Sequence, residues 1–302
     1  MSQRRRVFPL IPRKRLSGTP FGERRSTRRG HGSDVAGTRP YVPGDPVSTI
    51  DWFASARLSS ARGEDAFVVR QMYAEEAPRV IVVSDRRASM SLYSGDLPWL
   101  SKPAAALAAA EAIARSAVAA RAELGHADAA GDHTRVLSPG AVAPRHIVDR
   151  VRRAVYDAPP ESLSRTLSHL LNRRADLPQG SFVFVLSDFL ADVPAGTWSG
   201  MRASYWEVVP VVIQDPVWEQ SFPDVAGVLI PFASADRSET ALVRLSGGDA
   251  STLRRENEER LARLLRRFRG AGFDPVLLGS SSPFDVDTTF LRWAERRRRR
   301  RR

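Results

Sequence analysis

Two short apolar runs, each followed by the dipeptide Ser-Asp, limit the possible folds of this sequence more than any other feature. The first covers residues 80–85 (VIVVSD) and the second covers residues 182–188 (FVFVLSD). An uninterrupted apolar run of this length is typical of a strand buried on both faces of a parallel sheet. Because the carboxyl ends of parallel strands share one edge, we expect two hydroxyls and two carboxylates on one rim. Open α/β sheets bind their ligands at such an edge.

Helical patterns separate these strands. The alternation of strands and helices implies βαβ crossovers and a mostly parallel sheet with helices on both faces. The sequence therefore predicts a doubly wound α/β fold. We expect helices over 97–122, 142–156, 162–174 and 253–269, further strands over 205–213 and 275–278, and hairpins that pair 126–130 with 134–137 and 228–232 with 241–245.

The charge of the chain is unevenly distributed. Of the formal net charge of +12, residues 1–30 contribute +9 and residues 296–302 contribute +7, so the 265 residues between them carry −4. Blocks of like charge at chain ends usually form solvated, disordered arms. Such arms can hold anionic lipid or nucleic acid weakly by releasing counterions.

The composition limits the chemistry and the compartment. The chain contains no cysteine, which excludes disulfides and Cys-ligated zinc. The longest apolar region, 103–122, is interrupted by Glu111, Arg115 and Arg121, so we do not expect it to span a membrane. The basic N-terminal region has no apolar signal core. We expect a cytoplasmic protein, with any contact at the inner face of the membrane being peripheral.

We predict four regions along the chain. Residues 1–33 are expected to form a disordered basic arm, 34–78 a short segment of distinctive sequence, 79–290 the α/β domain, and 291–302 an arginine tail. Within the second region, Pro43-Gly44-Asp45-Pro46 has the chemistry of a turn. We expect a short helix capped by Ser48 or Thr49 and ending near Arg57, followed by a strand over 66–72.

The acids of this segment have two interpretations. Asp45 and Asp51 could act as a catalytic pair presented by a loop, or they could be structural, with Asp45 bonding its own turn and Asp51 interacting with a helix dipole. We favour the structural interpretation, in which Trp52 packs the segment onto the sheet. The bidentate partners expected for the acids are Arg39, Arg57 and Arg70.

The same segment carries a resemblance to a known family. Gly37-x-Arg39-x-Tyr41-x-Pro43-Gly44-Asp45 is followed by Ile50-Asp51-Trp52, Ala56-Arg57, Val69-Arg70 and Glu75 or Glu76. This pattern resembles the signature of domain-of-unknown-function family 58, and the resemblance covers roughly residues 34–290. It implies a von Willebrand factor A-like domain after the signature and a partnership with a MoxR-type AAA+ ATPase.

The resemblance also implies a metal-ion-dependent adhesion site at the rim, with the pattern Asp-x-Ser-x-Ser plus a distant Thr and Asp. Asp85, Ser89 and Asp188 match this pattern, and they are the expected metal ligands. Arg87 stands at the first serine position, and Glu161 or Ser162 stands where the threonine is expected.

Mg²⁺ prefers six oxygen ligands, whereas arginine has no acceptor and carries a permanent positive charge. We therefore expect no cofactor, with Mg²⁺ bound weakly or not at all. Two hypotheses for Arg87 remain open. It could pair with Asp85 or Asp188 in place of the cation, or it could point to solvent while the carboxylates cap nearby helices.

Common catalytic motifs are missing from the sequence. It contains no Gly-x-Ser-x-Gly elbow, no phosphate-binding Gly-x-x-x-x-Gly-Lys loop and no closely spaced histidine pair.

The leading hypothesis is a non-enzymatic adaptor that binds a MoxR-type AAA+ ATPase and a client protein. The alternatives are anchoring to membrane or nucleic acid through the arginine-rich termini, and a metal-dependent hydrolase using Asp85 and Asp188. The adaptor would use a rim made by Asp85, Arg87, Ser89, Glu161, Ser162, Ser187 and Asp188.

Overall fold

The computed structural model describes residues 6–12, 35–72, 78–91, 101–131, 133–174, 177–225, 227, 229–233 and 240–301. The chain forms two compact units. The larger unit comprises Met1–Leu16 with Pro78–Arg302, and the smaller unit comprises Ser17–Ala77.

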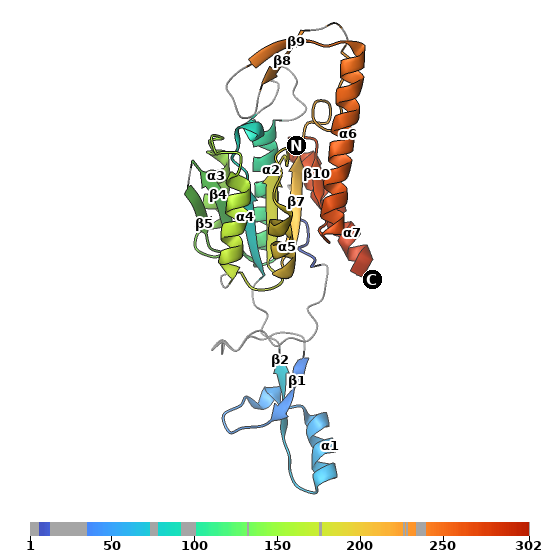
Figure 1. The fold of residues 1–302 in the computed structure, drawn as a ribbon. Helices are drawn as coiled ribbons and strands as arrows, with labels where there is room; N and C mark the ends of the chain where they lie inside the picture. The colour runs from blue at the N-terminus through green and yellow to red at the C-terminus, as the bar shows by residue number, and fades with distance from the viewer. Residues whose placement is uncertain are drawn as a thin grey trace, which may run out of the picture. The chain divides into compact units, whose positions relative to one another are not determined.

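The larger unit is built on a six-stranded sheet with the strand order β10-β7-β6-β3-β4-β5 (Figure 1). The pairings β10–β7, β7–β6, β6–β3 and β3–β4 are parallel, and only β5 runs antiparallel to its neighbour β4. This confirms the predicted α/β fold. The strand bounds are β3 Arg79–Ser84, β4 Glu123–Ala130, β5 His133–Leu137, β6 Phe182–Ser187, β7 Glu207–Ile213 and β10 Val276–Leu278.

Helices cover both faces of this sheet. One face packs on α2 (Lys102–Ala119), α3 (Pro144–Arg152) and α7 (Pro283–Arg301). The other face packs on α4 (Ser162–Asn172), α5 (Ala195–Ala203) and α6 (Gly247–Gly270). Successive residues of β3 and β6 alternate between the two apolar clusters, so each strand is buried on both sides.

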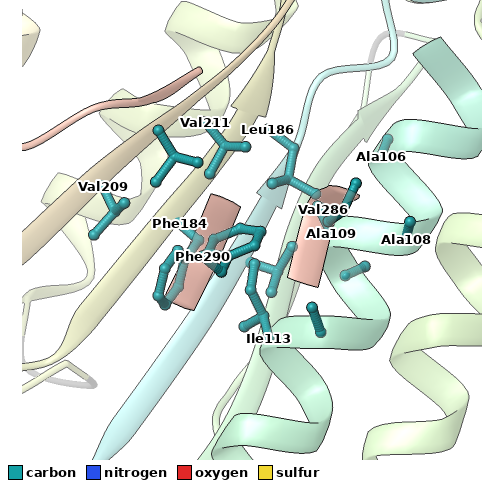
Figure 2. Close-up of a cluster of buried hydrophobic side chains, with 14 of the residues drawn as sticks. Ala106, Ala108, Ala109, Ile113, Phe184, Leu186, Val209, Val211, Val286 and Phe290 are labelled. Atoms are coloured by element: carbon teal, nitrogen blue, oxygen red, sulfur yellow. The ribbon is translucent and has the colours of Figure 1, made fainter. Parts of the chain in front are cut away.

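Alanine gives α2 its close approach to the sheet. Ala105, Ala109 and Ala112 are buried against the strands, and Figure 2 shows Ala109 and Ile113 facing Phe184 and Phe290. Alanine also has the highest helix propensity, so the same residues favour both the helix and its packing. The predicted start of this helix at residue 97 lies outside the described residues.

The expected hairpin that pairs 126–130 with 134–137 is confirmed, because β4 pairs with β5 in antiparallel register. Over residues 123–128, β4 also pairs in parallel with β3, which makes β4 an interior strand of the larger sheet. Gly125 lies inside β4. A Cβ atom there would come 2.6 Å from the carbonyl oxygen of Leu137, so close strand packing requires glycine.

Both chain ends differ from the expected solvated arms. Phe8 is buried, and its ring stacks on Phe290 and meets Trp293 edge-on. At the other end, α7 continues helically to Arg301, and Arg297 is buried. The arm and tail are therefore ordered over residues 6–12 and up to 301, while residues 13–34 lie outside the described ranges.

A β-hairpin precedes α6. It consists of β8 (Leu229–Ala233) and β9 (Thr240–Arg244), which pair with each other. It lies at the N-terminal end of α6, apart from the main sheet (Figure 1). Ser246 and Asp249 form a capping box, so α6 begins six residues earlier than Leu253, where the sequence predicted it.

The smaller unit pairs β1 (Val35–Pro40) with β2 (Val68–Met72) in antiparallel fashion. Between them lie a short 3-10 helix, η1 (Val47–Thr49), and α1 (Trp52–Arg62). Asp51 caps α1 by accepting a hydrogen bond from the Ala54 amide, and Gly63 ends it with φ 70°. The predicted cap at Ser48 or Thr49 and the predicted end at Arg57 are therefore wrong.

Candidate functional site

The carboxyl ends of β3 and β6 lie side by side, as their sequences predicted. The Asp85 amide donates to the Leu186 carbonyl oxygen at 3.0 Å, and the Ser187 hydroxyl donates to Asp85 Oδ2 at 2.6 Å. We call the group of Asp85, Arg87, Ser89, Lys102, Ser187, Asp188 and Glu219 the strand-end site. Every member except Glu219 is buried, and the Glu219 side chain is 16% exposed.

Arg87 folds back over the end of the sheet and does not point to solvent. Its Nε lies 3.0 Å from each carboxylate oxygen of Asp85, and its backbone amide donates to Oδ1 of the same residue. Its Nη2 also donates to Asp85 Oδ2, to Ser187 Oγ at 3.2 Å and to Asp188 Oδ1 at 3.3 Å. Of the two hypotheses for Arg87, this geometry favours pairing with both carboxylates.

Lys102 supplies a second buried cation. It is the first residue of α2, and its Nζ donates to the Ser89 carbonyl oxygen at 2.9 Å, to Asp188 Oδ2 at 3.1 Å and to Glu219 Oε1. Sequence reasoning missed both Lys102 and Glu219. The only available signal was that Lys102 is one of two lysines in an arginine-rich chain.

Burial and the two cations act in opposite directions on the pKa values of Asp188 and Glu219. Burial would raise the pKa of Asp188, but the charges of Lys102 and Arg87, with the Leu190 amide, hold that pKa below its usual value. Burial raises the pKa of Glu219, and Lys102 only partly opposes this. Asp188 is therefore ionised at neutral pH.

The backbone around Asp188 is also held in place. Gln214 Nε2 donates to the Asp188 carbonyl oxygen at 2.6 Å. Phe189 follows with a left-handed φ of 52°, and its ring packs against Phe268 and Trp198. Left-handed backbone is costly for a bulky residue, so this packing must hold the turn that follows β6.

The remaining rim residues lie near the site without joining it. The Ala158 amide donates to the Arg86 carbonyl oxygen at 3.1 Å, which brings the start of α4 beside the turn after β3. Ser162 is buried and Glu161 is exposed. In the parts of the chain that the structure describes, neither side chain hydrogen-bonds to Asp85, Arg87 or Asp188.

A second charged network lies beside β3. Asp128 on β4 pairs with Arg86 and accepts hydrogen bonds from Arg150 at 2.7 and 3.2 Å. His126 lies fully buried on the same strand, 3.0 Å from the Ser84 hydroxyl. Burial lowers the pKa of His126 to about 4, although nearby Asp128 opposes the shift. From the sequence alone, we expected His126 to lie in a loop or at a sheet edge, and this expectation is wrong because β4 is paired on both sides.

In the smaller unit, both acids serve local structure. Arg39 binds Asp45 with two hydrogen bonds of 2.7 and 2.6 Å, and Asp45 accepts the Val42 amide across the turn at Gly44 (φ 104°). Asp51 caps α1 and lies 3.8 Å from Arg70. These contacts favour the structural interpretation over a catalytic pair.

Other signature residues have less defined roles. The backbone amide of Tyr41, which precedes Pro43, donates to the Phe67 carbonyl oxygen at 2.8 Å. Trp52 meets the Phe67 ring edge-on and is 59% exposed within the structure. Its packing onto the main sheet stays a prediction. Arg57 is exposed and, among the described residues, makes no ion pair with Asp45 or Asp51.

The donor set at the strand end does not fit the divalent cation that the family resemblance implied. Arg87 Nη2 contacts the oxygens of Asp85, Ser187 and Asp188 that would face such an ion. Within the described ranges, no group of three His, Asp or Glu side chains is arranged to hold a metal ion. A surface cavity of about 440 Å³ lies elsewhere and is lined by His146, Asp149, Arg150 and Arg153.

Comparison with known proteins identifies the family. Residues 37–263 match the family model described as "Protein of unknown function DUF58". The chain belongs to the DUF58 family. This match spans the signature segment and most of the α/β unit, including every residue of the strand-end site.

The chain is also similar to individual proteins. The chain is 28% identical over 236 residues to the uncharacterized proteins Mb1516 of Mycobacterium bovis and Rv1480 of Mycobacterium tuberculosis, covering 76% of this chain and 70% of each relative. Among solved structures, the conserved hypothetical protein BatB from Bacteroides thetaiotaomicron aligns with a TM-score of 0.41 at 12% identity, covering 72% of this chain and all of BatB. No helix in the described parts of this DUF58 protein is long and apolar enough to cross a bilayer.

Proposed function

We propose that this protein is a non-enzymatic binding protein that links a MoxR-type AAA+ ATPase to a client protein. One observation carries the proposal: the carboxylates at the strand end are each engaged by a buried cation. General acid–base or nucleophilic catalysis needs a group that is free to exchange a proton or attack a substrate. A hydrolase using Asp85 and Asp188 would have to displace Arg87 and Lys102 first. We propose a cytoplasmic location for this activity.

The proposed contact surface is the exposed part of the rim. Pro160 and Glu161 are exposed at the start of α4, and Asp192 is exposed after β6. Asp192 follows Asp188 by four residues, and the hydrogen bond from Ala158 to Arg86 brings the segment before α4 beside the turn after β3. The buried strand-end site would act as a rigid support for these residues. A rigid support reduces the entropy lost when a partner binds.

The test is capture of partners from extracts of the native host with the full chain as bait, followed by mass spectrometry. We expect a MoxR-type AAA+ ATPase to be recovered. Glu161→Arg should weaken the recovery, whereas Glu123→Arg should not, because Glu123 lies at the amino end of β4, at the opposite end of the strands from the rim. Recovery of no AAA+ ATPase, or equal loss with both variants, would contradict the proposal.

A second candidate function rests on the arginines of α7. Arg296, Arg298, Arg299 and Arg300 are exposed on a continuous helix, whereas Arg297 is internal. A cluster of arginines attracts anionic lipid or nucleic acid, and this attraction weakens with salt. Replacing Arg298, Arg299 and Arg300 with Gln should abolish binding to phosphatidylserine vesicles or DNA if the helix is an anchor. Unchanged binding would exclude it.

A further inference from the structure

We infer that Arg87 and Lys102 together take the place of the divalent cation at the strand end, so that the protein carries its own cation in covalent form. The inference concerns the chemistry of the site and does not depend on the proposed AAA+ partnership. Three observations support it: the position of Arg87 Nη2, the combined charge of Arg87 and Lys102, and the burial of both side chains.

Arg87 occupies the position where a bridging cation would lie. A cation that bridges Asp85 and Asp188 would have to lie between Asp85 Oδ2, Ser187 Oγ and Asp188 Oδ1. Arg87 Nη2 donates to all three of these oxygens. A bound Mg²⁺ would need oxygens at about 2.0–2.1 Å, which leaves no room for that nitrogen among the same oxygens.

Arg87 and Lys102 together supply the positive charge of a divalent ion. One guanidinium and one ammonium together supply two positive charges, which equals the charge of one divalent ion. Asp188 receives a contact from each cation, with Arg87 on Oδ1 and Lys102 on Oδ2. Lys102 also holds the Ser89 carbonyl oxygen and Glu219, so the second cation connects the turn after β3 to the segment after β7.

Burial makes this substitution permanent. The side chain of Arg87 is 6% exposed and that of Lys102 is 2% exposed, and both carboxylates are fully buried. Neither cation can exchange with solvent as a metal ion does. Any function of the rim should therefore be independent of divalent ions and insensitive to chelators.

The decisive experiment restores the hydroxyl that the family pattern expects. In the full-length chain, Arg87→Ser completes the Asp-x-Ser-x-Ser pattern that begins at Asp85. Mn²⁺ binding is measured by calorimetry, and thermal unfolding is measured with EDTA or with Mn²⁺. We expect the wild-type chain to show no Mn²⁺ binding that depends on Asp85. Arg87→Ser should unfold at a lower temperature in EDTA and regain roughly 2–4 °C when Mn²⁺ is about tenfold above its dissociation constant.

The matched control is Arg86→Ser. Arg86 is also buried, lies one residue away, and pairs with Asp128 instead of the strand-end carboxylates. This variant should lose stability without gaining any response to Mn²⁺. Adding Asp85→Asn to Arg87→Ser should abolish the Mn²⁺ response.

Three results would overturn the inference. The first is wild-type Mn²⁺ binding tighter than roughly millimolar that disappears in Asp85→Asn. The second is a folded Arg87→Ser chain that binds no Mn²⁺ up to such concentrations. The third is an equal Mn²⁺ response from Arg86→Ser. If Arg87→Ser does not fold in either condition, the wild-type titration against Asp85→Asn still decides whether the protein's own cations exclude the metal.

Discussion

The ammonium group of Lys102 lies 3.1 Å from Asp188 Oδ2, with both side chains buried at the carboxyl end of the sheet. Removing one partner of a buried pair leaves an uncompensated charge, which costs about 3–5 kcal/mol. Lys102→Met should therefore reduce the free energy of unfolding, measured by urea denaturation, by about that amount. The control is Arg267→Met, which breaks the exposed pair with Asp192 and should cost about 1 kcal/mol or less. Equal losses in the two variants would contradict this account of Lys102.

Arg87 and Asp85 should be strongly coupled. In a double-mutant cycle with Arg87→Met and Asp85→Asn, each single change leaves the other residue's buried charge without its partner, whereas the double change removes both charges. The double variant should therefore be less destabilised than the sum of the single variants, by about 1–3 kcal/mol. A cycle on the exposed pair Arg263–Glu259 of α6 gives the comparison and should show about 0.3–0.5 kcal/mol. Additive single effects at Arg87 and Asp85 would be inconsistent with the observed pairing.

His126 should make the protein less stable in mild acid. Its pKa is lowered to about 4 in the folded protein, against an ordinary value of 6.5. Between pH 6.5 and 4, His126 is protonated in the unfolded chain but neutral in the folded chain. His126 therefore reduces the free energy of unfolding as the pH falls from 6.5 towards 4. The full effect is about 3 kcal/mol, and it is absent above pH 6.5.

The pH effect is measured as the difference between the wild-type chain and His126→Gln in urea denaturation across pH 4 to 7. The wild-type chain should lose more stability than the variant over this range. His133→Gln changes an exposed histidine on the neighbouring strand β5 and should follow the wild-type curve. Parallel curves for the wild type and His126→Gln would show that His126 is not held neutral.

Arg297 should stabilise the fold although it lies within a run of seven arginines. It binds Glu207 and the Ile11 carbonyl oxygen, each at 2.8 Å, and its guanidinium lies 4.6 Å from the centre of the Trp293 ring. Arg297→Met leaves Glu207 without this partner and should lower the melting temperature clearly, by roughly 5 °C or more. Arg298→Met, on the exposed side of the same helix, should leave it nearly unchanged.

Phe8 should anchor the N-terminal segment in the core. Its ring lies 4.8 Å from that of Phe290 and also contacts Phe184 and Trp293. Replacing a buried Phe with Ala typically costs about 3–5 kcal/mol, and we expect Phe8→Ala to fall in this range in urea denaturation. Val7→Ala, at a position that is 45% exposed, should cost far less. A small effect of Phe8→Ala would mean that the segment does not stay in the core in solution.

The central architecture was predictable because its signals are local. The apolar runs at 80–83 and 182–186 mark buried strands wherever they occur, and their shared Ser-Asp ends predicted one rim. The turn at Gly44 and the pairing of Arg39 with Asp45 could also be predicted from the sequence, since they involve residues only a few positions apart. Helix ends were less accurate because a cap such as Asp51 is chosen by competition among several suitable polar residues.

The sheet, the helices on its two faces, and the placement of Asp85 and Asp188 on one rim follow from local sequence patterns. The cations that neutralise those carboxylates depend on tertiary contacts, because Lys102 and Asp188 are 86 positions apart in sequence. The same reason applies to the chain ends. By local composition, Phe8 and Arg297 belong to solvated arms. In the folded chain, Phe8 packs on Phe290, and Arg297 contacts Glu207 and Trp293. Local composition predicts what a segment does alone, whereas burial of a charge or a ring depends on partners that only the folded chain assembles.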